Sequence, residues 1–327
     1  MIYKTKDLAP KASPHHFVLP FPASLAYPCL MLFDRQRLLL TMLDALGEPV
    51  ANTDFQKLLF LYTQQCESSP SYQFVPYKFG AFSFTSYADK RRLTDAGLLV
   101  DDENHWRLTT AGRQLARKKA VAPLMVARFC RDHARLRGNR LIAEQYRRFP
   151  YYATRSEILD KVLHDAESRQ RVVAARPKKT RPGLLTIGYE GRSLEGYLNL
   201  LLTNSVTILC DVRRNPLSRK YGFSKTTLSK ACEGVGIRYQ HLPELGIDAE
   251  ERRDLNTQAD YDALFAEYER KSLPRQPHAL ATIRGWVQDG ERVALTCFER
   301  LPHQCHRHCV AKALARHAGK ELAALHL

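Results

Sequence analysis

The sequence predicts an α/β protein in which a helical, basic N-terminal half precedes a Rossmann-like domain with a mostly parallel sheet. The length of 327 residues suits two domains, each large enough for a core of its own. Apolar residues recur at helical spacing in the first half, whereas short apolar runs alternate with amphipathic segments after Leu184. With 44% hydrophobic and 26% charged residues, the chain is typical of soluble globular proteins, which excludes a largely disordered or multi-span membrane protein.

The start of the chain is apolar but is not expected to cross a membrane. Residues 17–33 read FVLPFPASLAYPCLMLF, and three prolines interrupt a run that is too short to span a bilayer. We expect residues 1–30 to be a loosely ordered extension. The eight cysteines have no regular spacing, which indicates reduced thiols and therefore a cytoplasmic protein.

The pattern of residues 31–120 predicts a winged helix-turn-helix. The first helix is expected over residues 33–46, and Asn52, Thr53 and Asp54 are expected to cap a second helix, FQKLLFLYTQQC. A basic third helix, YADKRRLTDAGLL, is followed by LLVDDENHWRLT, which has the two apolar runs of a hairpin. The pattern KLLFL…YKFGAFS…L…GLL also resembles the winged-helix modules of antitoxin-like and phage-defence-associated proteins. A small helical domain that contacts proteins is the alternative.

The excess of basic residues is concentrated in the first half. Residues 1–182 contain 30 Lys and Arg against 17 Asp and Glu, whereas residues 183–327 contain 20 against 17. Because a basic surface concentrates polyanions, we expect the first half to bind nucleic acid, with double-stranded DNA as the preferred partner. A solvated basic face is the alternative. The residues expected to contact nucleic acid are Lys78, Lys90, Arg91, Arg92, Arg113, Arg117, Lys118, Arg135, Arg137 and Arg140.

Three further segments complete the predicted organisation. We expect basic helices over residues 121–165 and a linker over residues 166–183, where ARPKKTRPG combines prolines with charges. Residues 184–327 are expected to form the α/β domain. No membrane partner is expected, and a homodimer is left open.

Polar residues of the second half follow the predicted strands LLTIG, VTILCD, IRYQH and RVALTC. The carboxyl ends of parallel strands share one edge of a sheet, where α/β proteins place their sites. The catalytic candidates there are Glu190, Asp211, Glu299 and Cys305. The substrate-binding candidates are Tyr189, Arg213, Asn215, Arg219, Ser224, Glu244, His306 and Arg307.

Several of these residues also have structural interpretations. Arg213 can pair with Asp211, and Arg307 can pair with Glu299, in ion pairs that only hold the fold together. Cys210 and Cys297 fit buried small residues of core strands. Glu244 can cap a turn.

Four motifs in the second half resemble the family known as domain of unknown function 488. They are TIGYEGRSLE, DVRRNPLSRKYGFS, HLPELG and CFE…CHR, and the resemblance covers about residues 184–325. It implies a fold and a site, and an association with nucleic-acid or defence functions. It implies no particular reaction.

Three chemistries fit the candidate residues. Carboxylates beside arginines suit glycosidic or phosphoester cleavage of a nucleotide or nucleic acid. Cys305, next to Arg307 at a helix N-terminus, suits attack by a thiolate. Metal binding by Cys297, His303, Cys305, His306, His308 and Cys309 is the third, but we expect no metal and no other cofactor because the paired Cys-Xaa2-Cys knuckles of structural zinc are absent.

These observations predict a nucleic-acid-binding protein whose α/β domain acts on a nucleic acid or nucleotide, as a hydrolase or nucleic-acid-modifying enzyme in phage defence or DNA repair. The alternative is a DNA-binding transcriptional regulator whose α/β domain senses a small anion. Replaceable carboxylates in the pocket would favour the regulator.

Overall fold

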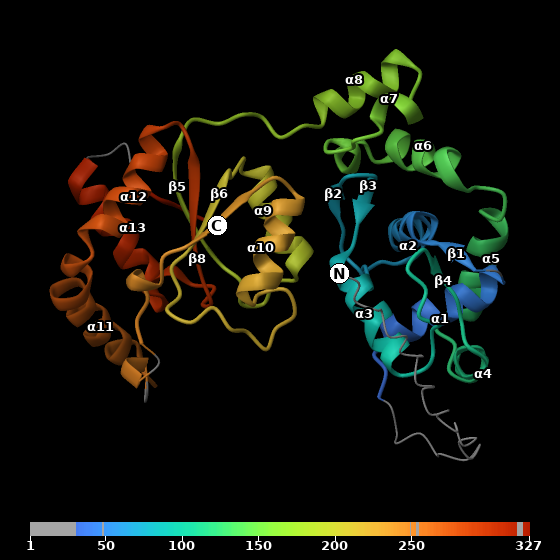
Figure 1. Ribbon diagram of the computed structural model, residues 1–327, viewed down its shortest axis with the longest axis horizontal. Coiled ribbons are helices and arrows are strands. Elements are labelled where there is room, and N and C mark those ends of the chain that lie inside the picture. Colours follow the sequence, from blue (N-terminus) through green and yellow to red (C-terminus); the bar gives the residue numbers. More distant parts are fainter. Residues whose placement is uncertain (1–30, 48, 249, 253–254, 319–322) are drawn as a thin grey trace, which may run out of the picture. The chain divides into compact units, whose positions relative to one another are not determined.

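The computed structural model describes residues 31–47, 49–248, 250–252, 255–318 and 323–327 (Figure 1). The extension predicted over residues 1–30 lies outside the described residues. None of the described helices is both long and apolar enough to cross a bilayer.

The N-terminal half is mainly helical. Its helices are α1 (Asp34–Leu46), α2 (Asn52–Cys66), α3 (Phe84–Asp95), α4 (Thr110–Lys118), α5 (Pro123–Asp132), α6 (Gly138–Arg148), α7 (Leu159–Val162) and α8 (Ala166–Ala174). The first three were expected from the sequence. Ser83 caps α3 and Thr109 caps α4, since each side chain accepts a hydrogen bond from the backbone of the first turn. Asn52 does not cap α2: its amide instead donates to the carbonyl of Glu103.

Two short antiparallel pairs accompany these helices. Strand β1 (Val50–Ala51) pairs with β4 (His105–Trp106), and β2 (Val75–Tyr77) pairs with β3 (Gly80–Phe82). The segment predicted as a hairpin does turn back on itself, because Leu99 and Leu108 form an antiparallel bridge. This half is thus a helical region with short strand pairs, and the winged helix-turn-helix stays a prediction.

The segment expected to be a linker contains a helix. Asp165 accepts a hydrogen bond from Ser168 N and so caps α8, while Val172 on the same helix is buried. Residues 166–174 are therefore packed structure, and irregular chain leads only from Ala175 to the first strand of the sheet. The linker was predicted from the charged, proline-rich stretch ARPKKTRPG, and that stretch lies after the helix.

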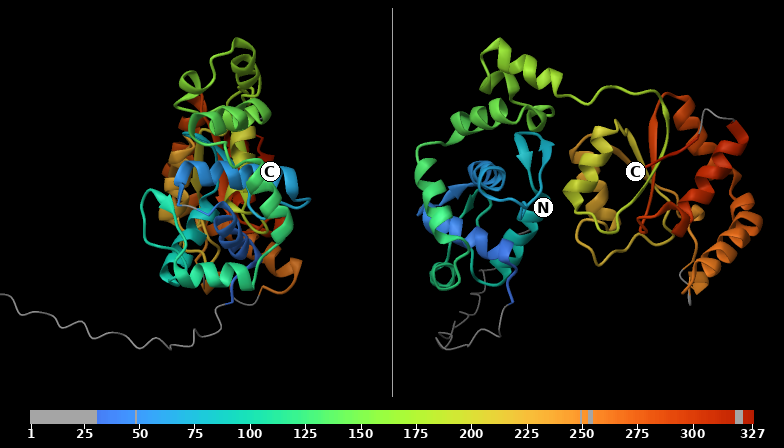
Figure 2. Two further views of the ribbon diagram at one scale, coloured as in Figure 1. Left: turned by 90° about the vertical axis from the view of Figure 1, so that its right-hand side faces the viewer. Right: turned by 180° about the vertical axis from the view of Figure 1, so that it is seen from behind.

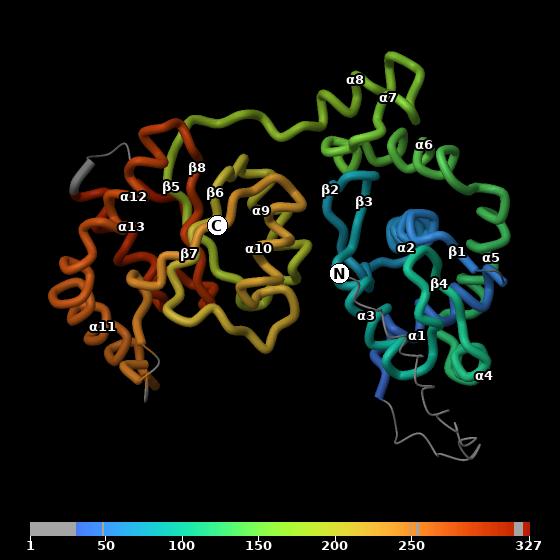
Figure 3. The backbone as a smooth tube through the Cα atoms, viewed as in Figure 1, coloured from blue at the N-terminus to red at the C-terminus, as the bar shows by residue number. Residues whose placement is uncertain are grey.

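The C-terminal half contains a five-stranded parallel sheet in the order β7-β6-β8-β5-β9. The labels β5, β6, β7 and β8 locate it in Figure 3. The strands are β5 (Gly183–Gly188), β6 (Ile208–Asp211), β7 (Arg238–His241), β8 (Arg292–Cys297) and β9 (Leu325–His326). The first four confirm the strands expected from the sequence. Strand β8 pairs with β5 on one side and β6 on the other, so Cys297 and the residues after it leave from the middle of the sheet.

Helices cover both faces of the sheet, each over its own apolar core (Figures 1 and 2). On one face, α9 (Leu194–Thr203) and α10 (Lys225–Gly234) bury Leu198 and Leu228 against Leu185 and Leu209. On the other, α11 (Gln258–Glu267), α12 (Pro277–Gln288) and α13 (Arg307–Ala318) cover the opposite side chains of the same strands. Burial on both faces explains why β5, β6 and β8 are nearly continuous apolar runs.

Candidate functional site

A cleft of about 860 Å³ lies at the carboxyl ends of β5, β6 and β8. Of the residues predicted from the sequence, its lining includes Tyr189, Arg213, Asn215, Arg219 and Glu299. The cleft also contains Arg214, Arg252 and Phe298, which the prediction did not select, and Cys297, which was named only for the metal alternative. Three strand ends therefore supply one site, as expected for a parallel α/β sheet.

The polar lining of the cleft combines arginines with carboxylates. Arg214 and Arg219 are exposed, and the Nε atom of Arg214 lies 2.9 Å from Asp248 Oδ1. Phe298 is 44% exposed and contacts the ring of Tyr189 edge-on at a centroid distance of 5.3 Å. A ligand with anionic groups, hydrogen-bond donors and a planar ring finds a partner for each of them in this lining.

Asp211 and Arg213 form a buried ion pair beside the cleft. The Asp211 carboxylate is fully buried and accepts hydrogen bonds from Arg213 N (3.1 Å), Arg213 Nε (2.8 Å) and Tyr239 Oη (2.6 Å), while Arg213 Nη2 donates to its second oxygen. Arg213 Nη1 also donates to Tyr189 Oη at 3.1 Å and to the carbonyl of Phe223 at 2.9 Å. Because Asp211 is surrounded by these donors, its role is to fix Arg213 and the loop after β6.

At the floor of the cleft, Cys297 lies within a cluster of polar groups. Its Sγ atom is 3.4 Å from Glu299 Oε2 and 3.7 Å from His306 Nδ1. Cys305 contributes a second sulfur: the ligand atoms of Cys297, Cys305 and His306 all lie within 4.8 Å of one another, and all three residues are buried. Arg252 reaches the same place and donates to His306 Nδ1 at 2.7 Å and to Glu299 Oε1 at 3.3 Å.

The orientation of His306 is fixed by the strand next to its helix. Its Nε2 atom lies 2.9 Å from the carbonyl oxygen of Val212, so Nε2 carries the proton and donates it. Nδ1 is then the atom with the free lone pair, and it points toward Cys297 and Arg252. The imidazole thus presents a lone pair, rather than a proton, to the cluster.

The groups of this cluster shift one another's pKa values in opposite directions. Burial opposes ionisation of Cys297, but a hydrogen bond from Cys305 and the nearby guanidinium group of Arg252 lower the pKa of the Cys297 thiol well below its usual value. Burial, and then the charge on Cys297, raise the pKa of the Glu299 carboxyl. Burial, and then the contact with Cys297, raise the pKa of the Cys305 thiol well above its usual value. Of the two thiols in the cluster, Cys297 is therefore the one that ionises more readily.

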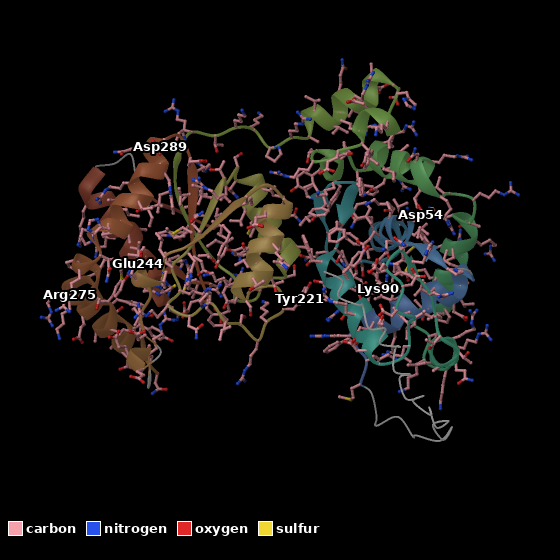
Figure 4. All side chains as sticks on the ribbon, in the orientation of Figure 1. Asp54, Lys90, Tyr221, Glu244, Arg275 and Asp289 are labelled. Atoms are coloured by element: carbon pink, nitrogen blue, oxygen red, sulfur yellow. The ribbon has the colours of Figure 1, made fainter. Side chains whose placement is uncertain are left out.

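Other predicted site residues hold the loops rather than line the cleft. Glu190 is exposed and accepts a hydrogen bond from Arg300 N at 2.9 Å. Ser224 closes the loop before α10 by bonding the backbone of Ser218 in both directions. Arg307 is buried and donates to the carbonyls of Glu299 and Arg300. Glu244 lies in a short 3-10 turn after β7 and is not part of the lining (Figure 4).

Gly188 explains how Glu299 reaches the cleft. A Cβ atom at this position would lie 1.9 Å from the carbonyl oxygen of Glu299, which is a clash with backbone. Only glycine lets the loop after β8 pass this close to the end of β5. The motif TIGYEG therefore contributes a close approach in addition to Tyr189.

The prediction missed Arg252, Arg214 and Phe298, and it considered Cys297 only as a metal ligand. Cys297 stood at a strand exit with Glu299 two residues later, but its apolar surroundings favoured the interpretation as a core thiol. Phe298 follows it directly and was passed over as apolar. Arg252 and Arg214 belong to charged stretches, ERRD and VRRN, in which the sequence does not tell which arginine turns inward.

The ten predicted nucleic-acid contacts divide into two sets. Lys90 is buried, donates to Asn52 Oδ1 and the carbonyl of Asp102, and lies 5.2 Å from the centre of the Trp106 ring. Four others are held by ion pairs or backbone carbonyls of the N-terminal half, namely Lys78, Arg113, Arg117 and Arg137. The five that are exposed and form no ion pair within the described part of the chain are Arg91, Arg92, Lys118, Arg135 and Arg140.

Comparison with known families identifies part of the C-terminal half. Residues 193–314 match the family described as Domain of unknown function DUF488. This segment is a DUF488 domain. The match begins after β5 and ends within α13, so it contains Arg213, Cys297, Glu299 and His306, while Tyr189 and β9 lie outside it. The resemblance expected over residues 184–325 is thus confirmed for its central part. No curated protein matches the chain closely enough to serve as a relative.

Proposed function

We propose that the DUF488 domain and its first strand form a hydrolytic enzyme for a nucleotide or nucleic acid, which binds in the cleft at the carboxyl ends of β5, β6 and β8. The observation that carries this proposal is the position of Glu299. Its side chain is 19% exposed on the floor of the cleft, and its carboxyl group lies between Arg252 and Cys297. A carboxyl group that reaches the substrate can accept or donate the proton that hydrolysis requires.

The rest of the lining suits the parts of a nucleotide. Arg214 and Arg219 are exposed on the side of the loop after β6 and can bind phosphate oxygens through paired N–H groups. Phe298 offers an exposed ring on which a base can stack. Asp211 is not a catalytic residue in this proposal, because its oxygens are occupied by Arg213 and Tyr239 and it has no exposed surface. It is a positioning residue for the loop that carries the arginines.

The N-terminal half is the proposed nucleic-acid-binding part. Support comes from the exposed cations of α3 to α6, which include Arg91, Arg92, Lys118, Arg135 and Arg140. We propose duplex DNA as the partner and a winged helix-turn-helix as the mode of binding, with α3 as the recognition helix. In this mode Arg91 and Arg92 contact the DNA, whereas Lys90 does not, because its ammonium group is bonded inside the fold.

A regulator that senses a small anion is the second candidate, and the mixed lining of the cleft speaks against it. Four of its residues are carboxylates, Asp248, Glu250, Glu251 and Glu299. These carboxylates repel a small anion, whereas a nucleotide also has hydroxyl and amino groups that can donate hydrogen bonds to them.

The decisive experiment measures products and variants together. The full-length protein is incubated with nucleoside mono-, di- and triphosphates and with labelled single- and double-stranded oligonucleotides, and the products are separated by anion-exchange chromatography. We expect turnover of at least one of them, a loss of about 100-fold or more in kcat for Glu299→Gln, and an increased KM for the Arg214→Ala/Arg219→Ala variant.

The control is Arg275→Ala, because Arg275 is exposed and lies away from the cleft lining (Figure 4). It should leave kcat and KM unchanged. No product from any substrate with folded protein, or full activity of Glu299→Gln, would refute the proposal. If substrates bind but none is converted, the sensor is favoured.

A further inference from the structure

We propose that Cys297, Cys305 and His306 bind one thiophilic divalent cation, Zn²⁺, with Glu299 beside its fourth position. Two sulfurs and one imidazole nitrogen are donors that zinc prefers, and three protein ligands with one open position are typical of catalytic zinc. Binding of the ion does not depend on the proposed function. Its use in hydrolysis does rest on that function.

The spacing of the donor atoms fits such an ion. With Zn–S near 2.3 Å and Zn–N near 2.1 Å, the edges of a tetrahedral site are about 3.6 Å long. Cys297 Sγ lies 3.7 Å from His306 Nδ1 and 3.4 Å from Glu299 Oε2. Cys305 Sγ lies within 4.8 Å of both other ligand atoms, so a small contraction completes the triangle of ligands.

His306 already has the arrangement of a metal ligand. Ligating histidines usually donate their second ring N–H to a carbonyl or carboxylate, which fixes the tautomer and the ring orientation. His306 does this through Nε2 and the carbonyl of Val212 at 2.9 Å, and leaves the lone pair of Nδ1 facing Cys297. The donor that the ion needs is therefore free of its own proton and aimed at the sulfur.

Arg252 supplies a positive charge next to the position proposed for the ion. Its guanidinium group donates to His306 Nδ1 at 2.7 Å and to Glu299 Oε1 at 3.3 Å, two of the atoms proposed to surround the ion. The cluster thus already attracts a cation. The ion and the guanidinium cannot share the Nδ1 lone pair, so Arg252 must release His306 when the metal binds. Removal of Arg252 should therefore strengthen metal binding or leave it unchanged.

The ion would sit where it can act. Cys297 and Glu299 both line the cleft, whereas Cys305 and His306 lie beneath its surface, so the open position faces the substrate. A zinc ion at such a position lowers the pKa of a bound water and supplies the hydroxide for hydrolysis. One histidine, two thiolates and an unligated glutamate are also the set by which zinc deaminases activate water against a nucleobase. The substrate class is accordingly one that water attacks, at a phosphoester or at a base.

A second cluster in the same half provides a matched control. Glu269, His308 and Cys309 also have ligand atoms within 4.8 Å of one another. Glu269, however, is paired with Lys312 at 3.2 Å and with Arg316 at 3.4 Å, and only Cys309 is buried. We expect no tight metal binding there.

The test measures the metal directly. Full-length protein is stripped with a chelator, reloaded with Zn²⁺ and desalted, and zinc is quantified by mass spectrometry; affinity is measured against a coloured chelator. We expect one zinc per chain for wild type, Cys309→Ser and Arg252→Ala. Cys297→Ser and Cys305→Ser should each bind at least about 100-fold more weakly, because loss of even an outer partner of a ligand costs roughly 10- to 100-fold.

Cobalt substitution keeps the result independent of activity and of folding. Co²⁺ bound to two thiolates gives intense sulfur-to-metal absorption, which should weaken in either cysteine variant whose circular dichroism matches wild type. If a cysteine variant does not fold, wild type and Arg252→Ala still decide the question by stoichiometry. Failure of the reloaded wild type to hold zinc, or equal losses in Cys309→Ser and Cys297→Ser, would overturn the proposal. Zinc binding without turnover would instead refute only the proposed function.

Discussion

Asp211→Asn should destabilise the C-terminal sheet strongly, even though the substitution keeps the shape of the side chain. It removes the negative charge from a fully buried pair and leaves the guanidinium of Arg213 at 6% exposure without its partner. Breaking a buried ion pair on one side costs about 3–5 kcal/mol. The carboxamide oxygen that this substitution introduces can still accept from Tyr239 or from Arg213 N, so we expect the lower end of that range, about 3 kcal/mol.

Hydrogen exchange measured by mass spectrometry on the full-length protein tests this magnitude. Peptides covering β6 and β8 should exchange roughly 150-fold faster in Asp211→Asn, since each 1.36 kcal/mol corresponds to a factor of ten. Peptides covering α2 serve as the internal reference for the N-terminal half. Glu299→Gln is the matched control, because its side chain reaches the cleft and its exchange should stay within about 1 kcal/mol of wild type.

The double variant Asp211→Leu/Arg213→Met separates lost charge from lost packing. Replacing both members of a buried ion pair by apolar residues is often neutral. The double variant should therefore be more protected than Asp211→Asn alone. Wild-type exchange in Asp211→Asn, or still faster exchange in the double variant, would show that the pair does not hold the loop as we have argued.

Three further predictions concern other parts of the chain. Arg91→Ala/Arg92→Ala should weaken duplex binding and reduce the slope of log affinity against log salt by about 0.9 for each phosphate that the variant no longer neutralises, at a stability cost within about 0.5 kcal/mol. Lys90→Ala should cost about 1–3 kcal/mol, because it removes a buried ammonium group that donates to two part-buried acceptors. Equal stability of the two variants in thermal melts would contradict this. Burial lowers the pKa of Lys57 to about 7. Between pH 7 and the ordinary pKa of lysine, the unfolded chain therefore holds more protons than the native one, so native stability should rise with pH over that window. Melting temperatures at pH 7, 8 and 9 should show this rise in wild type but not in Lys57→Met. Gly188→Ala should displace the loop after β8 and lower both zinc stoichiometry and turnover in a folded protein, and unchanged zinc content would show that the close approach to Glu299 is dispensable.

The sequence predicted the parts of the fold that depend on local pattern. Strands β5, β6 and β8 follow from apolar runs such as TILC and VALTC, and the edge of the sheet that carries the site follows from their parallel order. Strand β9 is only two residues long, so it carries no such pattern, and it forms because Leu325 and His326 pair with β5. Helix α8 was not predicted, because the charged, proline-rich stretch that follows it led to the interpretation of residues 166–183 as a linker.

Which side chains face the cleft could not be predicted in the same way. Asp211 and Arg213 are two residues apart after the same strand, and only the fold shows that they bond each other rather than a ligand. Cys297 was placed at a strand exit by its position, but its role depends on Cys305 and His306, which return to it through a loop. Arg252 comes from 54 residues before His306, a distance at which sequence spacing carries no information.

The two hydrogen-bonding atoms of His306 connect parts of the chain that differ widely in sequence separation. Nδ1 faces Cys297, nine residues earlier, whereas Nε2 bonds Val212, 94 residues earlier. Since loop closure costs entropy that grows as the logarithm of loop length, forming the second contact from the open chain costs about 2 kcal/mol more than forming the first. The segment from Cys297 to His306 can therefore assemble while the chain is still folding, and docking of β6 then fixes the imidazole. A metal ion bound to that segment would hold its three ligands together before β6 docks, and its binding free energy would add to the stability of the native state.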